Sequence, residues 1–281
     1  MSLPPVHSKF PPMTAKPYFV SLHHEIKLEE NLPAIGAWDE AALNLLQNAR
    51  GVLMPKYFSP PRYRYVASLA RSHFPRLSTR YAYRGKSSQI HLFRRLGLPH
   101  PKSWIFATPQ QALQAGLSGS LPLAFPFVLK GDSGGGGSAV FPVCNQVDLE
   151  HGLSALPPCE PVLLQEWIEN GGRDLRVVLM GPLLRSYFRL GGESFYNNVS
   201  RGARIDSGLL PDQQRMGRQM ALHAARRAEI DLAAFDIMFT TEGRPLFIEI
   251  NFLFGTKGLG GSRGYGRLFR QAVQEWMASL Q

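Results

Sequence analysis

The sequence predicts an α+β protein, because strand and helix patterns alternate along its 281 residues and several of the strands form hairpins. A strand–helix–strand pattern over 18–55 indicates a small α/β unit at the N-terminal end. Two strand patterns flank the glycine-rich stretch 133–137, and two more form a hairpin over 234–251. With 44% apolar residues, the chain can bury one large core or the cores of two to three subdomains.

The expected elements follow in chain order after a proline-rich lead over 1–17, which we expect to be poorly ordered. Ser87 or Ser88 is expected to cap a helix running to Leu96, and Gly97 suits the left-handed position beyond its end. The other expected elements are strands at 18–22, 51–55, 126–130, 139–143, 161–167 and 175–181, helices at 38–49 (with Asp39 near its start), 61–74 and 212–228, and the final hairpin.

The formal net charge of +10, from 31 Lys and Arg against 21 Asp and Glu, favours anionic partners. Because the basic residues are spread along the chain, we expect nucleotides or other small polyanions rather than a nucleic-acid surface. No stretch approaches the roughly 20 apolar residues of a membrane span, and the N-terminal residues lack the apolar core of a signal peptide. Cys144 and Cys159 form no paired motif, which favours a reducing compartment. We therefore expect a soluble cytoplasmic protein that has no membrane partner.

The final hairpin carries the sharpest chemical signal. If Glu242-Gly243 forms a two-residue turn, Asp236 lies directly opposite Glu249. Directly opposed side chains stand about 4.5–5.5 Å apart on one face, and Asn251 points the same way as Glu249. Two carboxylates and an amide oxygen suit Mg²⁺ or Mn²⁺. The alternative is a polar face open to water, with both carboxylates paired to arginines, and a three-residue turn would break the register.

The glycine-rich stretch 133–137 is expected to tip a hairpin. It is neither a P-loop nor a dinucleotide fingerprint, because no Gly-Lys-Ser/Thr follows the glycines and no helix begins there. Backbone N–H groups of such a tip can approach phosphate oxygens, and Lys130 on the preceding strand can reach the same anion. The alternative is a plain flexible loop beside a lysine whose ammonium reaches solvent.

The stretch 165–177 leaves backbone groups unpaired between two strands, which suits hydrogen bonding to an adenine edge. Trp167 and Ile168 offer apolar contact, and Asp174 or Glu169 could accept hydrogen bonds from ribose hydroxyls. An ordinary tight turn explains the same residues.

Taken in this order, these motifs resemble the ATP-grasp superfamily, and within it the RimK-like and glutathione-synthetase-like carboxylate–amine ligases, over residues 83–281. The resemblance implies two α+β lobes clasping ATP, preceded by a short α/β subdomain. The implied division is 1–82 for the N-terminal subdomain, 83–160 for the central lobe and 161–281 for the C-terminal lobe.

The resemblance also implies roles for single residues. Implied contacts to the ATP phosphates are Lys86, Lys130, Ser133, Gly134, Gly135, Gly136 and Gly137. Glu166, Trp167 and Ile168 match the adenine linker, Asp174 the acidic residue near the ribose, and Arg176 the arginine of a "DxR" motif. Implied catalytic residues are Arg189 near the γ-phosphate, Asn198 in the same pocket and Lys130, with Arg201 on substrate. Asp236, Glu249 and Asn251 match the ligands of two Mg²⁺ or Mn²⁺ ions. Arg176 and Arg201 have an alternative role as structural ion-pair partners.

Two stretches depart from the ligase pattern. The region before Lys86 looks trimmed, and the glycine-rich segment 252–266, with Lys257 and Arg263, follows Asn251 where a serine–proline turn is more usual. We expect this segment to line the acceptor site, so the resemblance names neither the carboxylate nor the amine.

The expected reaction is therefore ATP-dependent joining of a carboxylate and an amine through an acyl-phosphate, on amino acid, peptide or related small substrates. Two alternatives stay open, namely a kinase that phosphorylates a small molecule and a non-catalytic ATP-binding regulator. Homo-oligomerisation is left open as well.

Overall fold

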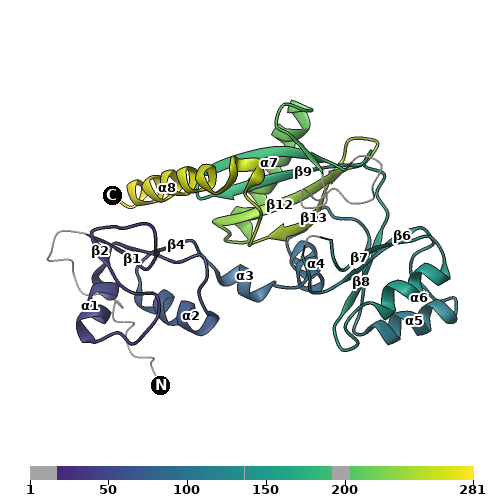
Figure 1. Ribbon diagram of the computed structural model, residues 1–281, viewed down its shortest axis with the longest axis horizontal. Helices are drawn as coiled ribbons and strands as arrows, with labels where there is room; N and C mark the ends of the chain where they lie inside the picture. The colour runs from purple at the N-terminus through teal and green to yellow at the C-terminus, as the bar shows by residue number, and fades with distance from the viewer. Residues whose placement is uncertain (1–17, 136, 192–202) are drawn as a thin grey trace, which may run out of the picture. The chain divides into compact units, whose positions relative to one another are not determined.

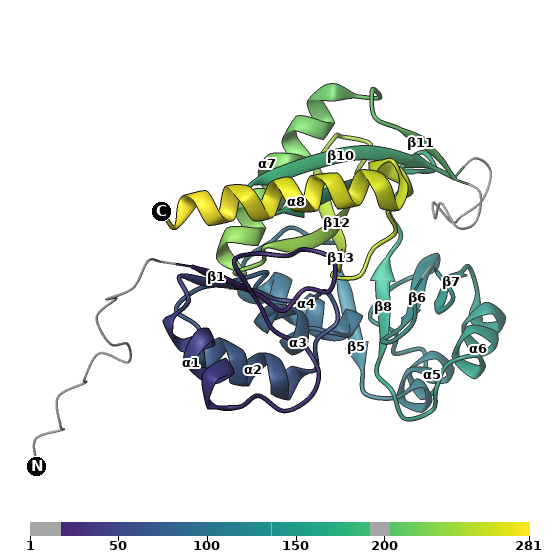
Figure 2. The ribbon, with the colours of Figure 1, turned by 60° about the vertical axis from the view of Figure 1, so that its left-hand side comes forward.

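The computed structural model of the protein describes residues 18–135, 137–191 and 203–281. They form two compact units, whose elements are labelled in Figures 1 and 2. The first unit takes residues up to Leu77, the turn Met180–Leu183 and the C-terminal stretch Arg263–Gln281, and the second takes Ser78–Leu179 and Leu184–Ser262. The three-part division at 82/83 and 160/161 stays a prediction, although the C-terminal helix packs in the first unit.

The first unit is built on a four-stranded parallel sheet of order β2-β1-β3-β4. Asp39 accepts a hydrogen bond from Ala42 N (2.9 Å) and so begins α1, as the sequence predicts. Trp276 of α8 lies so close to Gly51 that a Cβ there would come within 2.7 Å of its ring. The elements are β1 (Phe19–Ser21), β2 (Glu30–Asn31), α1 (Glu40–Asn48), β3 (Gly51–Leu53), α2 (Pro60–Leu69), β4 (His73–Phe74) and α8 (Gly261–Ser279).

The second unit contains two sheets. One is an antiparallel sheet of order β5-β8-β6-β7, and two helices, α5 and α6, lie together beside it in Figures 1 and 2. The expected hairpin around the glycine loop is confirmed, because Lys130 on β6 pairs with Val140 on β7. The elements are β5 (Ser103–Phe106), α5 (Pro109–Leu117), β6 (Phe127–Gly131), β7 (Val140–Val143), α6 (Gln146–Ser154) and β8 (Val162–Glu166).

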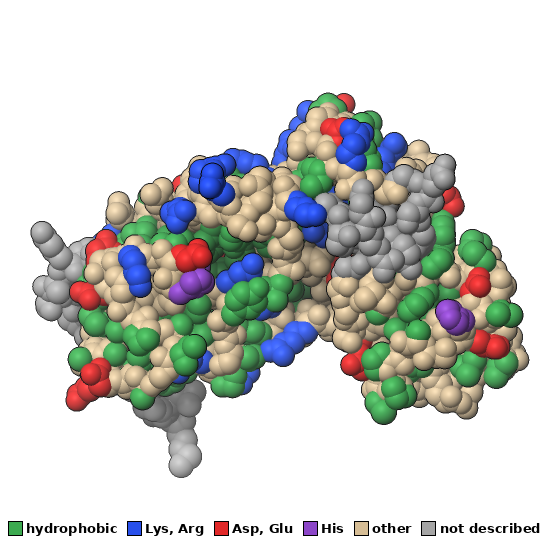
Figure 3. Space-filling model, viewed as in Figure 1, with side chains coloured by type: hydrophobic (Ala, Val, Ile, Leu, Met, Phe, Trp, Pro, Cys, Tyr) green, Lys and Arg blue, Asp and Glu red, His purple; other side chains and the backbone are tan. Residues whose placement is uncertain are grey.

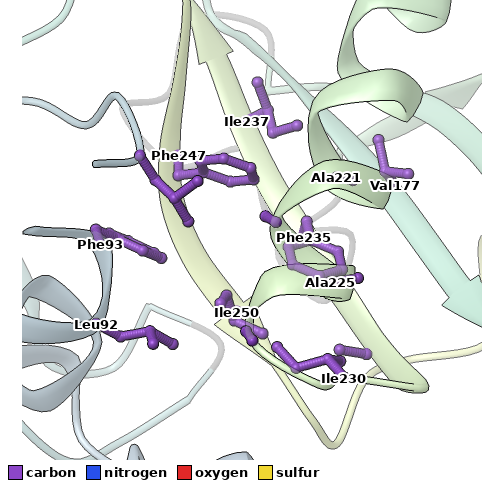
Figure 4. Packing of buried hydrophobic residues seen from close by; sticks show 14 of the residues in the cluster. Leu92, Phe93, Val177, Ala221, Ala225, Ile230, Phe235, Ile237, Phe247 and Ile250 are labelled. Carbon is purple, nitrogen blue, oxygen red and sulfur yellow. The ribbon is translucent and has the colours of Figure 1, made fainter. Parts of the chain in front are cut away.

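The other sheet has five strands in the order β11-β10-β9-β12-β13. Apolar side chains of β12 and β13, including Phe235 and Phe247, pack with Ala221 of α7 and Phe93 of α4 in one continuous cluster (Figure 4). The elements are α3 (Ser78–Ala82), α4 (Lys86–Arg95), β9 (Arg173–Met180), β10 (Leu183–Leu190), β11 (Arg204–Asp206), α7 (Pro211–Arg227), β12 (Leu232–Phe239), β13 (Pro245–Asn251) and a 3₁₀ turn (Lys257–Leu259).

Helix α4 begins before both serines that were expected to cap it, so that prediction is wrong. Gly85 occupies the N-cap, and the backbone N–H of Ser87 donates instead to Asp132 Oδ1 (2.7 Å), 45 residues away. A Cβ on Gly85 would clash with the Asp132 carboxylate, which explains the glycine. The left-handed Gly97 after the helix is confirmed by its φ of 60°.

The tip of the final hairpin differs from the predicted two-residue turn. Thr240 N donates to Arg244 O (3.0 Å), which leaves a three-residue loop over 241–243. Gly243 takes the left-handed conformation (φ 79°) that such a loop requires at its third position.

The predicted pairing of Asp236 with Glu249 is nevertheless confirmed. Ile237 pairs with Phe247, so Ile248 is an extra residue on β13, a β-bulge. The bulge shifts the register by one and cancels the shift made by the three-residue loop.

On the face drawn in Figure 3, Lys and Arg side chains are dispersed among other types. Within the described ranges, no helix is both long and apolar enough to span a membrane. Cys144 and Cys159 are exposed and unbonded to each other.

Candidate active site

The second unit encloses a cavity of about 800 Å³, a size typical of small-molecule sites. Its lining draws on both sheets, on the N-terminus of α4 and on the glycine loop. Ser133 is absent from the lining, while Gly136, Asn198 and Arg201 fall outside the described residues. The predicted site residues that the structure brings together are Lys86, Lys130, Gly134, Gly135, Gly137, Glu166, Trp167, Ile168, Asp174, Arg176, Arg189, Asp236, Glu249 and Asn251.

The stretch expected to contact adenine joins the two sheets of this unit, because β8 lies in one sheet and β9 in the other. Glu166 is fixed at its start by two hydrogen bonds with Lys102, from Glu166 N to the carbonyl (2.8 Å) and from Lys102 N to Oε2 (3.1 Å). The backbone groups of Ile168 and Glu169 have no hydrogen-bond partner among the described residues. They line the cavity, and so offer the donors and acceptors that a planar base would need.

The glycine loop is tied to helix α4. Lys86 Nζ donates to Gly134 O (3.1 Å) and to Ser133 O (3.5 Å), so this predicted phosphate ligand contacts the loop backbone. The Ser133 hydroxyl donates to Glu160 Oε2 (2.5 Å), which explains why its side chain does not line the cavity. Gly134 and Gly137 have φ values of 100° and 76°, a conformation that other residues rarely adopt.

Lys130 is a buried cation at the cavity wall, with 8% of its surface exposed. Its Nζ donates to Gln165 Oε1 (2.6 Å). The pKa of Lys130 is lowered to about 8, mainly by burial; Glu249 and Asp236 oppose this shift, whereas Lys86 contributes to it.

Four charged side chains of alternating sign form a network across β9, β10 and β12; Asp174, Arg189 and Asp236 are buried, and Arg176 is partly buried. Arg176 donates twice to Asp236, from Nε and from a terminal nitrogen (2.8 Å each). Arg189 also contacts Asp236 (3.1 Å) and donates to both oxygens of Asp174, from Nε at 2.8 Å. The alternative role of Arg176 as an ion-pair partner is thus what the structure shows. Burial alone would raise the pKa of Asp236, but the two arginines outweigh it and hold the pKa below its usual value.

The three predicted metal ligands do lie together. Asn251 Nδ2 donates to Asp236 Oδ2 (2.9 Å), which leaves the Asn251 carbonyl oxygen without a partner among the described residues. Glu249 lines the cavity and has no hydrogen-bond or ion-pair partner among them either. The pKa of Glu249 is raised by burial and by Asp236, although Lys86, Lys130 and Arg176 oppose that shift. The alternative of arginine pairing therefore holds for Asp236 but not for Glu249.

Three further residues shape the site that the sequence did not single out. Gln165 and Glu166 are the two polar residues of the otherwise apolar β8, a signal that could have found Gln165. Asp132 caps α4 from a distant position and gives no local signal. Tyr187 packs so tightly on Gly258 that a Cβ there would come within 2.1 Å of its ring.

The fold and the cavity together define an ATP-grasp protein, and the predicted fold is confirmed by solved structures. The VanG D-Ala:D-Ser ligase from Enterococcus faecalis has a TM-score of 0.60 at 15% identity, over 83% of this chain and 73% of that one. The N5-carboxyaminoimidazole synthase from Aspergillus clavatus, solved with ADP, has a TM-score of 0.53 at 17% identity, over 76% and 55%. At these identities the likeness shows the fold alone.

A sequence model of the RimK-like ATP-grasp domain matches residues 83–265, more than half of the chain, and the protein belongs to this family. It is 28% identical over 190 residues to the ribosomal protein bS6–L-glutamate ligase of Escherichia fergusonii, over 64% of this chain and 59% of that protein. It is 29% identical over 133 residues to β-citrylglutamate synthase B of Danio rerio, over 46% and 32%. The chain thus spans about three-fifths of the length of the glutamate ligase and about one-third of that of the synthase.

Proposed function

We propose that the protein is an ATP-dependent carboxylate–amine ligase, which forms a C–N bond through an acyl-phosphate. Its substrates would be an amino acid, a peptide or a related small carboxylate, together with an amine. The observation that carries the proposal is one cavity of a RimK-like domain in which two lysines, a glycine loop and Glu249 meet, and Glu249 has no side-chain partner within the described ranges. Two relatives whose names specify a glutamate ligase and a citrylglutamate synthase support this class of reaction.

ATP would lie with its adenine against the backbone of Glu166, Trp167 and Ile168 and its phosphates between Lys86, Lys130 and the glycine loop. Lys86 would exchange its hydrogen bonds to the loop carbonyls for bonds to phosphate oxygens, which are better acceptors for an ammonium. Gly134, Gly135 and Gly137 let the backbone approach the phosphates closely, and in our proposal Gly136 belongs to the same loop.

Asp236, Glu249 and Asn251 would hold Mg²⁺ or Mn²⁺, and the residues fit such an ion. Among the residues that the structure describes, the Glu249 carboxylate and the Asn251 carbonyl oxygen have no partner, and Asp236 Oδ1 accepts a single hydrogen bond, from Arg176. No three His, Cys, Asp or Glu side chains in the described ranges are grouped to hold a metal, so the set depends on the Asn251 amide oxygen. Such ions neutralise charge on the ATP phosphates and orient them.

In the proposed reaction, a carboxylate oxygen attacks the γ-phosphorus, the bond to the bridging oxygen breaks and ADP leaves. The amine nitrogen then attacks the acyl carbon, loses a proton and expels inorganic phosphate. Lys130 and Arg189, which line the cavity, would stabilise the charge on the transferring phosphoryl group. The same role that the resemblance implies for Asn198 stays a proposal, because Asn198 lies outside the described residues. A glycine loop that closes over the site would exclude water, which otherwise hydrolyses the acyl-phosphate.

We also propose that the protein acts in the cytoplasm, where ATP is supplied and where Cys144 and Cys159 stay reduced.

The test is ADP release from Mg-ATP with a pool of amino acids and small peptides whose carboxylates carry ¹⁸O. The ligase reaction predicts one ¹⁸O atom in each phosphate released and a joined product lighter than its parts by one water. Glu249→Gln should abolish both. A phosphorylated acceptor with no free phosphate would instead identify a kinase, and ATP binding without turnover on any acceptor would favour a regulator.

A further inference from the structure

A chain of three hydrogen bonds leads from a backbone carbonyl to the Lys130 ammonium. Ser103 Oγ donates to Pro101 O (2.7 Å), Gln165 Nε2 donates to Ser103 Oγ (3.0 Å), and Lys130 Nζ donates to Gln165 Oε1 (2.6 Å). The three side chains are buried, with exposed fractions of 4%, 2% and 8%. The sheet register creates the chain, since Ser103 stands directly opposite Gln165 and Lys130 lies on the diagonal beside it.

The direction of this chain is fixed by chemistry. A carbonyl oxygen only accepts, so the single hydrogen of the Ser103 hydroxyl is committed to Pro101. The hydroxyl oxygen can then only accept, and it takes the N–H of Gln165. The carboxamide of Gln165 is thereby held with its oxygen toward Lys130. The flipped amide would turn an NH₂ group against an ammonium.

We infer that Gln165, oriented by Ser103, is a positioning residue that holds the Lys130 ammonium for binding nucleotide phosphates. This inference rests on the proposed function. Among the described residues, Gln165 is the hydrogen-bond partner of Lys130 Nζ, while the acidic neighbours Glu249 and Asp236 form no ion pair with Lys130. One of three ammonium hydrogens is thus engaged, and two remain for phosphate oxygens. Without Gln165, the flexible Lys130 side chain would be ordered only when the nucleotide binds, and the entropy lost in that ordering would weaken binding.

The test compares binding of ATP with binding of adenosine, which lacks phosphates, by calorimetry. Gln165→Met keeps the length of the side chain but removes the acceptor, and Ser103→Ala frees the amide to flip. We expect about tenfold weaker ATP binding for Gln165→Met and about threefold for Ser103→Ala, with adenosine affinity unchanged. Ser103→Thr keeps the hydroxyl and should restore ATP affinity.

Gln214→Met is the matched control, because Gln214 is another buried glutamine, bonded to Ser186 and to the backbone of 207 and 209 and absent from the cavity lining. Gln214→Met should lower the melting temperature about as much as Gln165→Met does, but it should leave the affinities for ATP and for adenosine unchanged. In a Lys130→Met background, Ser103→Ala should change ATP affinity less than twofold, since its effect passes through Lys130.

Equal losses for ATP and adenosine, or an unchanged effect of Ser103→Ala without Lys130, would overturn the inference while the nucleotide site stands. Wild-type protein that binds neither ligand would overturn the proposed function and the inference with it. If Gln165→Met does not fold, Ser103→Ala and Ser103→Thr decide the outcome.

Discussion

Asp236 and Glu249 face each other across β12 and β13, yet only Asp236 is ion-paired among the described residues. Two arginines and Asn251 supply four hydrogen-bond or ion-pair contacts to the Asp236 carboxylate, while the Glu249 side chain lines the cavity with no partner in the described part of the chain. The two acidic residues therefore differ in what they do for the protein. Asp236 balances the charges of Arg176 and Arg189, and in our proposal Glu249 binds a metal cation that the chain does not itself supply.

Glu249→Gln is expected to raise the melting temperature at pH 7 while abolishing the proposed activity. Burial raises the pKa of Glu249, so its ionised form costs stability in the folded protein at any pH above that pKa. Below the unfolded pKa of about 4.3 both states are protonated and the difference from wild type should vanish. Thermal unfolding of wild type and Glu249→Gln at pH 7 and near pH 4 measures the two differences. A lower melting temperature of Glu249→Gln than of wild type at pH 7 would mean that Glu249 has a stabilising partner.

Asp236→Asn is expected to act in the opposite direction. It leaves Arg176 and Arg189 without their shared anion, and breaking a buried pair costs roughly 3–5 kcal/mol. The pKa of Asp236 is held low, so its contribution is present above the unfolded pKa and is lost as the pH falls through the folded pKa. Urea unfolding of the two single variants gives the comparison directly.

Asp174→Ala should destabilise the protein by roughly 3–5 kcal/mol, because Arg189 keeps its charge in a buried setting. The exposed pair of Asp212 and Arg215 is the matched control, and Asp212→Ala should cost no more than about 0.5 kcal/mol. Removing Arg189 together with Asp174 should cost less than the sum of the single changes. Similar losses at Asp174 and Asp212 would show that the buried network contributes little to stability.

The affinity for ATP should fall as the pH rises through 8. Burial lowers the pKa of Lys130 to about 8, and only the protonated amine attracts phosphate. One linked proton allows a loss of up to about tenfold per pH unit above that value. Lys130→Arg stays charged over this range and should show no such fall, and adenosine binding should not depend on Lys130 at all. A parallel decline in both proteins would assign the pH dependence to another group.

Gly258→Ala should destabilise the site by about 1–3 kcal/mol, because the new methyl group would lie within 2.1 Å of the Tyr187 ring. Tyr187 is itself buried and lines the cavity, so its displacement should also weaken ATP binding. Gly255→Ala is the matched control in the same segment, since a Cβ there meets nothing within 4 Å. Equal effects of the two substitutions on melting temperature would show that Tyr187 moves aside freely.

The sequence correctly predicts that Asp236 pairs with Glu249, although the two-residue turn from which the pairing was derived is wrong. Asp236 is the one polar residue of the otherwise apolar β12, and Glu249 and Asn251 alternate with apolar residues on β13, so the polar positions are a local signal for the face that carries them. Whether the loop takes two or three residues depends on the turn residues, whereas the compensating bulge at Ile248 depends on packing over the whole sheet. Register therefore could not be derived from the turn alone.

Features set by distant residues were missed for the same reason. The cap of α4 comes from Asp132, and the hydrogen-bonded chain to Lys130 depends on which strands are neighbours. Helix α8 was missed because glycines at its start disguise an amphipathic helix that follows. Lys130 and the glycine loop, by contrast, lie in one short stretch of sequence and Lys86 lies in another, so each could be singled out from local sequence.

Gln89 gives β13 the hydrogen bonds that another strand would supply. Its side-chain amide donates to Ile250 O (2.9 Å) and accepts from Ile250 N (2.8 Å), so the sheet ends on helix α4 at this point. Lys86 lies one helical turn before Gln89, and Glu249 is the neighbour of Ile250. The Gln89 side-chain amide thus fixes the separation between Lys86 and Glu249, and the glycine loop takes no part in this contact. The rate at which the Ile250 amide hydrogen exchanges with solvent would then report how often α4 separates from β13, rather than how often β13 separates from β12.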